Sequence, residues 1–152
     1  MTREQLKEKV IAIVANAEFK ENKQYLIATV PQDKLYILAK TLKESEDASF
    51  DYLFCLSGMD WGDSLGVVYH MESTQLHHCI VLKTKTIDRE NPVLDSVCDL
   101  WKTADFLERE VFDLFGITFK NHPDMRRIFL DDNWQGHPLR KDYVDEINIV
   151  ER

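Results

Sequence analysis

FDYLFCLSGMDWGDSLGVVYHM, residues 50–71, is the stretch that decides the fold. Its first part alternates between two faces, and one face carries Phe50, Tyr52, Phe54 and Leu56. Its second part alternates again, through Leu65, Val67, Tyr69 and Met71. Alternation with a period of two indicates β-strands, and the Gly and Asp residues between the two parts are typical of a turn. The stretch therefore predicts a β-hairpin.

Further strands and helices are expected on both sides of this hairpin. LHHCIVLKTKT, residues 76–86, reads as the next strand, and QYLIATV, residues 24–30, as an earlier one. Thr2 to Gln5 has the pattern of a helix capping box, and apolar residues at helical spacing follow it. A second helical stripe lies in residues 31–45. Ser96 to Asp99 resembles another capping signature, before a stripe that ends at Gly116.

Strands separated by helices predict a two-layer α+β domain. We expect a mixed sheet of about five strands with helices on one face, followed by an irregular C-terminal tail. The core would occupy residues 1–116 and the tail residues 117–152, within one domain. The predicted core residues are Leu6, Val10, Ile13, Leu35, Leu38, Leu42, Phe54 and Leu82.

Composition narrows the class of protein. The 152 residues contain no apolar run long enough to span a membrane, and the N-terminus lacks the apolar centre of a signal peptide. We therefore expect a cytosolic chain. Its formal net charge of −8 argues against a nucleic-acid partner. Three scattered cysteines fit reduced thiols better than a disulfide framework.

The tail is the electropositive part of this acidic chain. Between Lys120 and Asp142 it holds five bases and four acids, a net charge of +1. His-Pro occurs twice, at His122 and His137, and a basic pair follows each occurrence. Arginine and large aromatic residues are enriched at protein interfaces. The chemistry of the residues alone leaves an interface and a loop packed on its own domain equally open.

Most cofactor sites lack their sequence patterns. An iron–sulfur cluster normally requires four cysteines at short spacings, and neither a zinc motif nor a phosphate-binding glycine motif is present. His77, His78 and Cys79 are consecutive on a predicted strand, so their side chains point to opposite faces and cannot share a metal ion. We therefore expect no cofactor-binding or metal-binding residue in this chain.

FLEREVFDLFG, residues 106–116, contains four charged residues on a predicted helix. Glu110 and Asp113 are neighbours on that helix and could form an acid/base pair, while Arg109 could pair with Asp113. The spacing by itself favours a solvated helix face over a catalytic pair.

Residues 106–143 resemble a known family. The motifs are Glu-Arg-Glu at 108–110, Asp113 with Gly-Ile at 116–117, His-Pro-Asp at 122–124, Arg-Arg-Ile at 126–128 and Gly-His-Pro-Leu-Arg-Lys-Asp at 136–142. This series resembles the C subunit, also called the 30 kDa subunit, of complex I, the proton-pumping NADH–quinone oxidoreductase. Upstream, FDYLFCLSGMDW resembles the family's strand that ends in Asp-Trp. The resemblance thus extends over the whole domain.

The resemblance implies a peripheral-arm subunit without a redox centre. NADH, FMN, iron–sulfur clusters and quinone would then be handled elsewhere in the complex. The chain would dock on the D subunit, near the B and I subunits, on the cytoplasmic side of the inner membrane, and support the quinone-reducing module.

The residues expected at the partner are Glu108, Arg109, Asp113, His122, Asp124, Arg126, Arg127, Trp134, His137, Arg140, Lys141 and Asp142. We expect the tail arginines to pair with partner carboxylates, so that replacing them leaves the isolated domain stable. The two histidines are expected to fix loop geometry.

Other functions remain open on the sequence. Related membrane-bound hydrogenases and other quinone-linked dehydrogenases share the motifs. A stand-alone adaptor, or a small hydrolase using Glu108, Glu110 and a histidine, is a further alternative.

Overall fold

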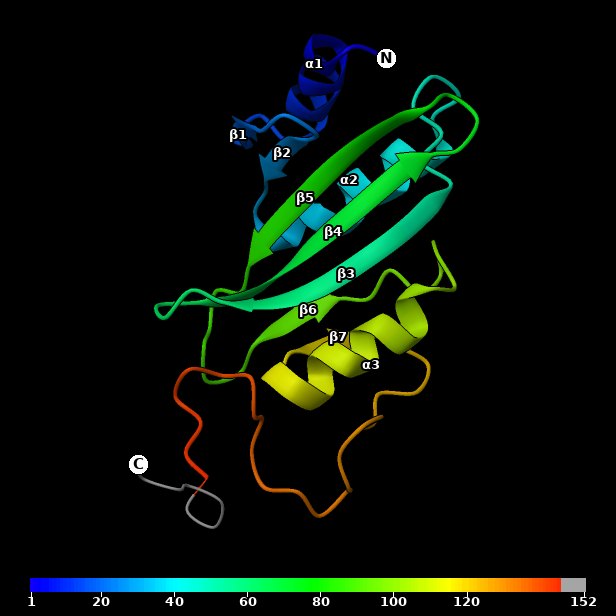
Figure 1. Ribbon diagram of the computed structural model, residues 1–152. Coiled ribbons are helices and arrows are strands. Elements are labelled where there is room, and N and C mark those ends of the chain that lie inside the picture. Colours follow the sequence, from blue (N-terminus) through cyan, green and yellow to red (C-terminus); the bar gives the residue numbers. More distant parts are fainter. Residues whose placement is uncertain (146–152) are drawn as a thin grey trace.

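The main sheet is mixed and has five strands. The computed structural model describes residues 1–145, and its strand order is β1-β2-β5-β4-β3. The strands are β1 (Glu18–Glu21), β2 (Leu26–Thr29), β3 (Tyr52–Asp60), β4 (Leu65–Ser73) and β5 (His78–Lys85). Strand β2 runs parallel to β5, and the other neighbours are antiparallel. The predicted hairpin is β3–β4, the long pair in Figure 1. The predicted α+β class is confirmed.

Three helices cover the sheet. They are α1 (Arg3–Ile13), α2 (Gln32–Glu44) and α3 (Ala104–Phe115). The capping box at Thr2 and Gln5 is confirmed, with both reciprocal hydrogen bonds present. Gly116 ends α3 with a φ of 75°, in the left-handed region that favours glycine. No helix among residues 1–145 is long and apolar enough to cross a membrane.

The core lies between the helices and one face of the sheet. Leu6 from α1, Leu38 from α2 and Val111 from α3 join the same cluster as Tyr69 and Leu82 from the sheet. All the predicted core residues except two are buried. Ile13 is only partly buried at the edge of the cluster, and Phe54 is half-buried outside it.

Phe54 is misplaced by the sequence pattern because β3 contains a bulge. The pairing with β4 shifts between Leu53 and Cys55, so one extra residue enters the strand there. An extra residue reverses which side chains face the core. Leu53 is therefore fully buried, while Tyr52 is 45% exposed and Phe54 contacts His70 on the opposite face.

The expected helix start at Ser96 is also wrong. Helix α3 begins eight residues later, and residues 98–100 form only a turn. The Ser96 hydroxyl accepts from the Cys98 amide and donates to Glu108 of α3, so this side chain closes the turn and ties it to the helix.

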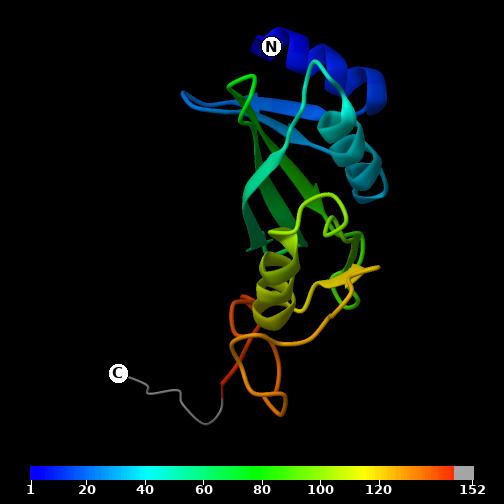
Figure 2. The ribbon, with the colours of Figure 1, turned by 90° about the vertical axis from the view of Figure 1, so that its right-hand side faces the viewer.

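The tail begins with a strand that the sequence did not indicate. Strand β7 (Thr118–Lys120) pairs in parallel with β6 (Val93–Asp95), as a second sheet of two strands. Residues 121–145 then follow without a helix or strand. In Figures 1 and 2 this orange-to-red segment loops below α3, at the opposite end of the molecule from α1.

Candidate docking surface

Three of the five charged residues of α3 face inward. Glu108 and Asp113 are 0% exposed and Arg109 is 9% exposed. The expectation of a solvated helix face is therefore wrong for these three residues. The expected Arg109–Asp113 pair does not form either, because the Arg109 guanidinium donates to the carbonyls of Arg126 and Arg127 instead. Arg109 and Asp113 hold the tail against the helix.

Asp113 is the acceptor around which the tail folds. Its Oδ2 accepts from three consecutive backbone N–H groups, those of residues 128–130, at 3.1, 2.7 and 2.9 Å. Its Oδ1 lies 2.8 Å from Nη1 of Arg127. Burial alone would raise the pKa of Asp113, but these donors outweigh it and hold the pKa below its usual range. The carboxylate therefore stays charged inside the protein.

Arg127 links Asp113 to a later part of the tail. Besides Asp113, its guanidinium donates to the carbonyls of Trp134 at 3.1 Å and Gly136 at 2.9 Å. Its side chain is only 12% exposed. A buried arginine that bonds a carboxylate and several carbonyls is a structural group. In this structure the donors of Arg127 are used within its own chain. Its pairing with a partner acid stays a prediction.

The two histidines brace the tail on the carbonyls of α3. His122 Nδ1 accepts from the Asp124 N–H, so the other nitrogen, Nε2, carries the proton and donates to the Asp105 carbonyl at 3.0 Å. His137 Nδ1 lies 2.9 Å from the Asp113 carbonyl oxygen. These contacts agree with the expected role in loop geometry. A Cβ on Gly116 would lie 2.6 Å from the His137 ring, so His137 also requires a glycine there.

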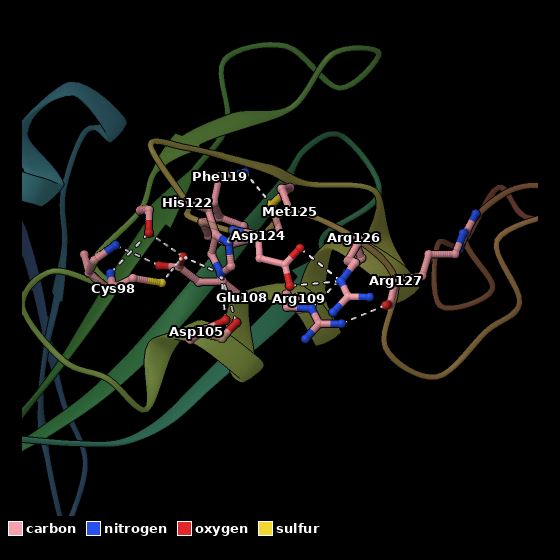
Figure 3. A network of polar contacts seen from close by, with 12 residues as sticks. Cys98, Asp105, Glu108, Arg109, Phe119, His122, Asp124, Met125, Arg126 and Arg127 are labelled. Atoms are coloured by element: carbon pink, nitrogen blue, oxygen red, sulfur yellow. Dashed lines mark hydrogen bonds and ion pairs between the residues drawn. The ribbon is translucent and has the colours of Figure 1, made fainter.

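A buried polar cluster joins three segments that are distant in sequence. Ligand-type atoms of Cys98, Glu108 and His122 lie within 4.8 Å of one another, and Figure 3 shows His122 beside both Asp105 and Glu108. Burial raises the pKa of Glu108, whose oxygens accept from the Ser96 hydroxyl, the Val97 N–H and the Cys98 thiol. Spacing arguments missed this set because no two members are close in the chain.

This cluster is arranged as a hydrogen-bond network. The His122 nitrogen that faces Glu108 is the one that carries a proton, so it presents a donor where a metal ion would need a lone pair. Burial raises the pKa of the Cys98 thiol to about 12, so the thiol keeps its proton as well. The absence of a metal site stays a prediction.

A second junction fixes the far end of the tail. Asp60 lies at the end of β3. Its carboxylate accepts hydrogen bonds from Nη1 and Nη2 of Arg89 and from the Lys141 N–H, each at 2.8 Å. Its pKa is lowered, chiefly by the Arg89 hydrogen bonds. Arg140 pairs with Asp142 and holds the pKa of that carboxyl down to about 2. Arg89 was not among the expected site residues, because no motif marks it.

The remaining expected residues lie nearer the surface. The side chains of Arg126 and Asp124 are 69% and 47% exposed and pair with each other. Trp134 is half-buried, and its indole N–H has no hydrogen-bond partner among the described residues. Three large apolar residues outside the set expected at the partner are exposed as well: Phe129 at 63%, Leu139 at 54% and Val144 at 66%.

Comparison with known proteins gives consistent matches. The family model described as respiratory-chain NADH dehydrogenase, 30 kDa subunit, matches residues 28–147. The C/D subunit of NADH-quinone oxidoreductase from Phocaeicola vulgatus is 52% identical over 120 residues, covering 78% of this chain but 23% of that protein. The C subunit of NADH-quinone oxidoreductase from Chloroherpeton thalassium is 47% identical over 118 residues, covering 76% and 49%. The chain thus spans about a quarter to a half of these relatives.

Among solved structures, a chain of the membrane-bound sulfane sulfur reductase, an archaeal respiratory membrane complex, superposes with a TM-score of 0.77. It is 26% identical, and the match covers 95% of this chain and 86% of that one. The fold is therefore shared with a chain of a respiratory membrane complex.

Proposed function

Because the chain belongs to the family of the 30 kDa subunit of respiratory-chain NADH dehydrogenase, we propose that it is a peripheral, non-redox subunit of an NADH–quinone oxidoreductase. It supports the quinone-reducing module by docking on the D subunit, and the docking surface is the tail, residues 121–145. The complex is the enzyme, and this chain supplies no catalytic group to it.

The fused relatives are the observation that carries this proposal. In Phocaeicola vulgatus and Bacteroides fragilis the matching segment is part of a single C/D protein. Two domains that some organisms make as one chain stay together in the assembled protein, so a D subunit is the natural partner of a separate C subunit.

The geometry of the tail supports docking. Every residue of 121–145 keeps some exposed surface, although the His122 side chain itself is buried and the segment contains Phe129, Trp134 and Leu139. Yet contacts to α3 and to Asp60 hold it in one shape. A fixed, partly apolar surface without regular structure is suited to binding another protein.

The remaining expectations of the resemblance belong to the same proposal. NADH, FMN, iron–sulfur clusters and quinone would bind other subunits. The B and I subunits would be further neighbours. The chain would lie on the cytoplasmic side of the inner membrane and attach through its partners.

A second candidate is the equivalent subunit of a related respiratory complex with another electron acceptor. The similarity to a chain of the membrane-bound sulfane sulfur reductase favours this alternative. Both candidates share the docking role and differ in the chemistry of the whole complex.

Affinity purification from native membranes, with a tag on this chain, tests the proposal and separates the candidates. Recovery of a D-type subunit together with NADH–quinone reductase activity supports the first. A D-type subunit together with reductase activity toward an acceptor other than quinone supports the second. Recovery of the chain alone contradicts both.

Hydrolytic turnover by the isolated chain would favour the hydrolase alternative, and a soluble partner would favour the adaptor alternative.

A further inference from the structure

The three arginines among residues 121–145 are already paired within their own chain. Arg127 bonds Asp113 and two carbonyls, and Arg140 pairs with Asp142 while only 15% of its side chain is exposed. Arg126, the most exposed of the three, forms an ion pair with Asp124. An exposed ion pair contributes little, and a guanidinium that already has a carboxylate gains less from a second one. These arginines are therefore poor candidates for the main attraction to a partner.

Large apolar side chains of the same segment point into solvent. Phe129, Leu139 and Val144 are each more than half exposed. For Phe129 the cause is visible in its backbone, because its N–H and those of both neighbours are held by Asp113. The main chain at Phe129 is therefore held against the buried Asp113 carboxylate, while the Phe129 ring points into solvent. Exposed aromatic residues on a rigid backbone are typical of binding hot spots.

A small groove lies beside Leu139. It has a volume of about 230 Å³ and runs between β3, α3 and the tail. Its lining residues are Leu56, Ser57, Gly58, Glu110, Val111, Leu114, Phe115 and Leu139. Sites for cofactors or other small molecules are usually larger, about 300–1,000 Å³. A mostly apolar groove of this size suits one apolar side chain of a protein partner.

We infer that the tail docks through apolar contact, with Phe129 and Leu139 lying against a D-type subunit and one apolar side chain of that subunit entering the groove. Arg127 and Arg140 position the tail without contacting the partner. This inference rests on the proposed function, since the fused C/D relatives identify the occupant. It replaces the expectation that arginines of the tail pair with partner acids.

The test uses the chain co-produced with the D-type subunit of its own complex, with the tag on that subunit. Phe129→Ser and Leu139→Ser, singly and together, remove apolar surface. Ile87→Ser is the matched control, because Ile87 is 86% exposed but lies outside the tail. The double variant is expected to lower retention of the chain about tenfold or more, and the control to leave it unchanged.

A second pair of variants blocks the groove without removing apolar surface. Ser57→Trp adds bulk at an exposed position of the rim, and Thr118→Trp does the same at an exposed position of β7 outside the groove. Only Ser57→Trp is expected to reduce retention. Thermal melting of each isolated variant shows that lost retention does not come from unfolding.

The dependence of binding on salt concentration distinguishes apolar docking from docking through ion pairs. Apolar docking is expected to survive about 1 M NaCl, where the Debye length falls to about 3 Å. Dissociation of the wild-type complex at high salt, together with loss of retention in Arg126→Ala but not in the apolar variants, would overturn the inference and leave the proposed function standing. Failure of the wild-type chain to be retained at low salt would instead contradict the proposed function.

Discussion

At the scale of single residues, Asp113 determines the geometry of the tail. One carboxylate satisfies three consecutive backbone N–H groups and the guanidinium of Arg127. Backbone N–H groups that lose their acceptor away from water cost free energy, and so does a buried cation without its anion. Position 113 therefore connects the end of α3 to the shape of the loop that carries Phe129.

Asp113→Ala is expected to lower the free energy of unfolding by about 3–5 kcal/mol, because it leaves Arg127 buried without its carboxylate. Arg127→Lys is expected to cost less, since it keeps the charge but loses the planar fork of donors. Asp132→Ala, at an exposed position of the tail, is the control and should change stability by less than about 0.5 kcal/mol. Denaturant unfolding measures all three. Equal stability of Asp113→Ala and wild type would show that the carboxylate does not hold the tail.

The same carboxylate gives a pH dependence of defined sign. The folded-state pKa of Asp113 lies below the usual value of 3.8, so the unfolded chain binds the proton more readily. Its contribution to stability is therefore complete above the unfolded pKa and is lost as the pH falls through the folded pKa. Asp113→Asn is expected to remove this part of the acid destabilisation. Unfolding free energies of variant and wild type that fall in parallel below about pH 4 would contradict this assignment.

At the scale of elements, the bulge in β3 decides which hairpin side chains reach the core. Leu53→Ala should cost about 2–5 kcal/mol, because Leu53 is fully buried. Phe54→Ala should cost less, since Phe54 lies half-buried on the opposite face of the sheet. Denaturant melts compare the two variants directly. A larger cost for Phe54→Ala would show that β3 in solution keeps a regular alternation and has no bulge.

Local signals in the sequence were sufficient for most elements and for some of the site. The capping box at Thr2, the glycine at 116 and the β3–β4 hairpin were each indicated by nearby residues, and all three are confirmed. The bulge was not predictable, because an inserted residue leaves both halves of the strand with a normal pattern. The short strands β6 and β7 were missed because three residues are too few to show periodicity.

The site was only partly predictable for a related reason. The motifs marked Asp113, His122 and Arg127, but whether such charges face solvent, a partner or their own chain depends on contacts across the fold. Asp113 meets Arg127 at a separation of 14 residues, and Asp60 meets Arg89 at a separation of 29. In both pairs one partner lies on a helix or strand and the other lies outside it, and spacing rules apply only within one helix or strand, so spacing could not indicate these pairs.

At the scale of the whole molecule, the account requires a subunit without its own redox chemistry. The chain purified alone under anaerobic conditions is expected to carry no flavin, iron–sulfur cluster or nicotinamide. The reasons are its three scattered cysteines and the lack of a phosphate-binding glycine motif. Absorption in the visible range, or stoichiometric iron and acid-labile sulfide, would contradict this prediction.

The central claim is that the tail joins this chain to a D-type subunit, and photo-crosslinking in the assembled complex tests it most directly. A photoreactive phenylalanine analogue replaces Phe129, which is 63% exposed, and in a second protein it replaces Ile87, which is 86% exposed. Native membranes are irradiated and the adducts are identified by mass spectrometry. We predict an adduct between position 129 and the D-type subunit and none with that subunit from position 87. An assembled complex in which position 129 crosslinks only to this chain itself, or to a different subunit, would contradict the account.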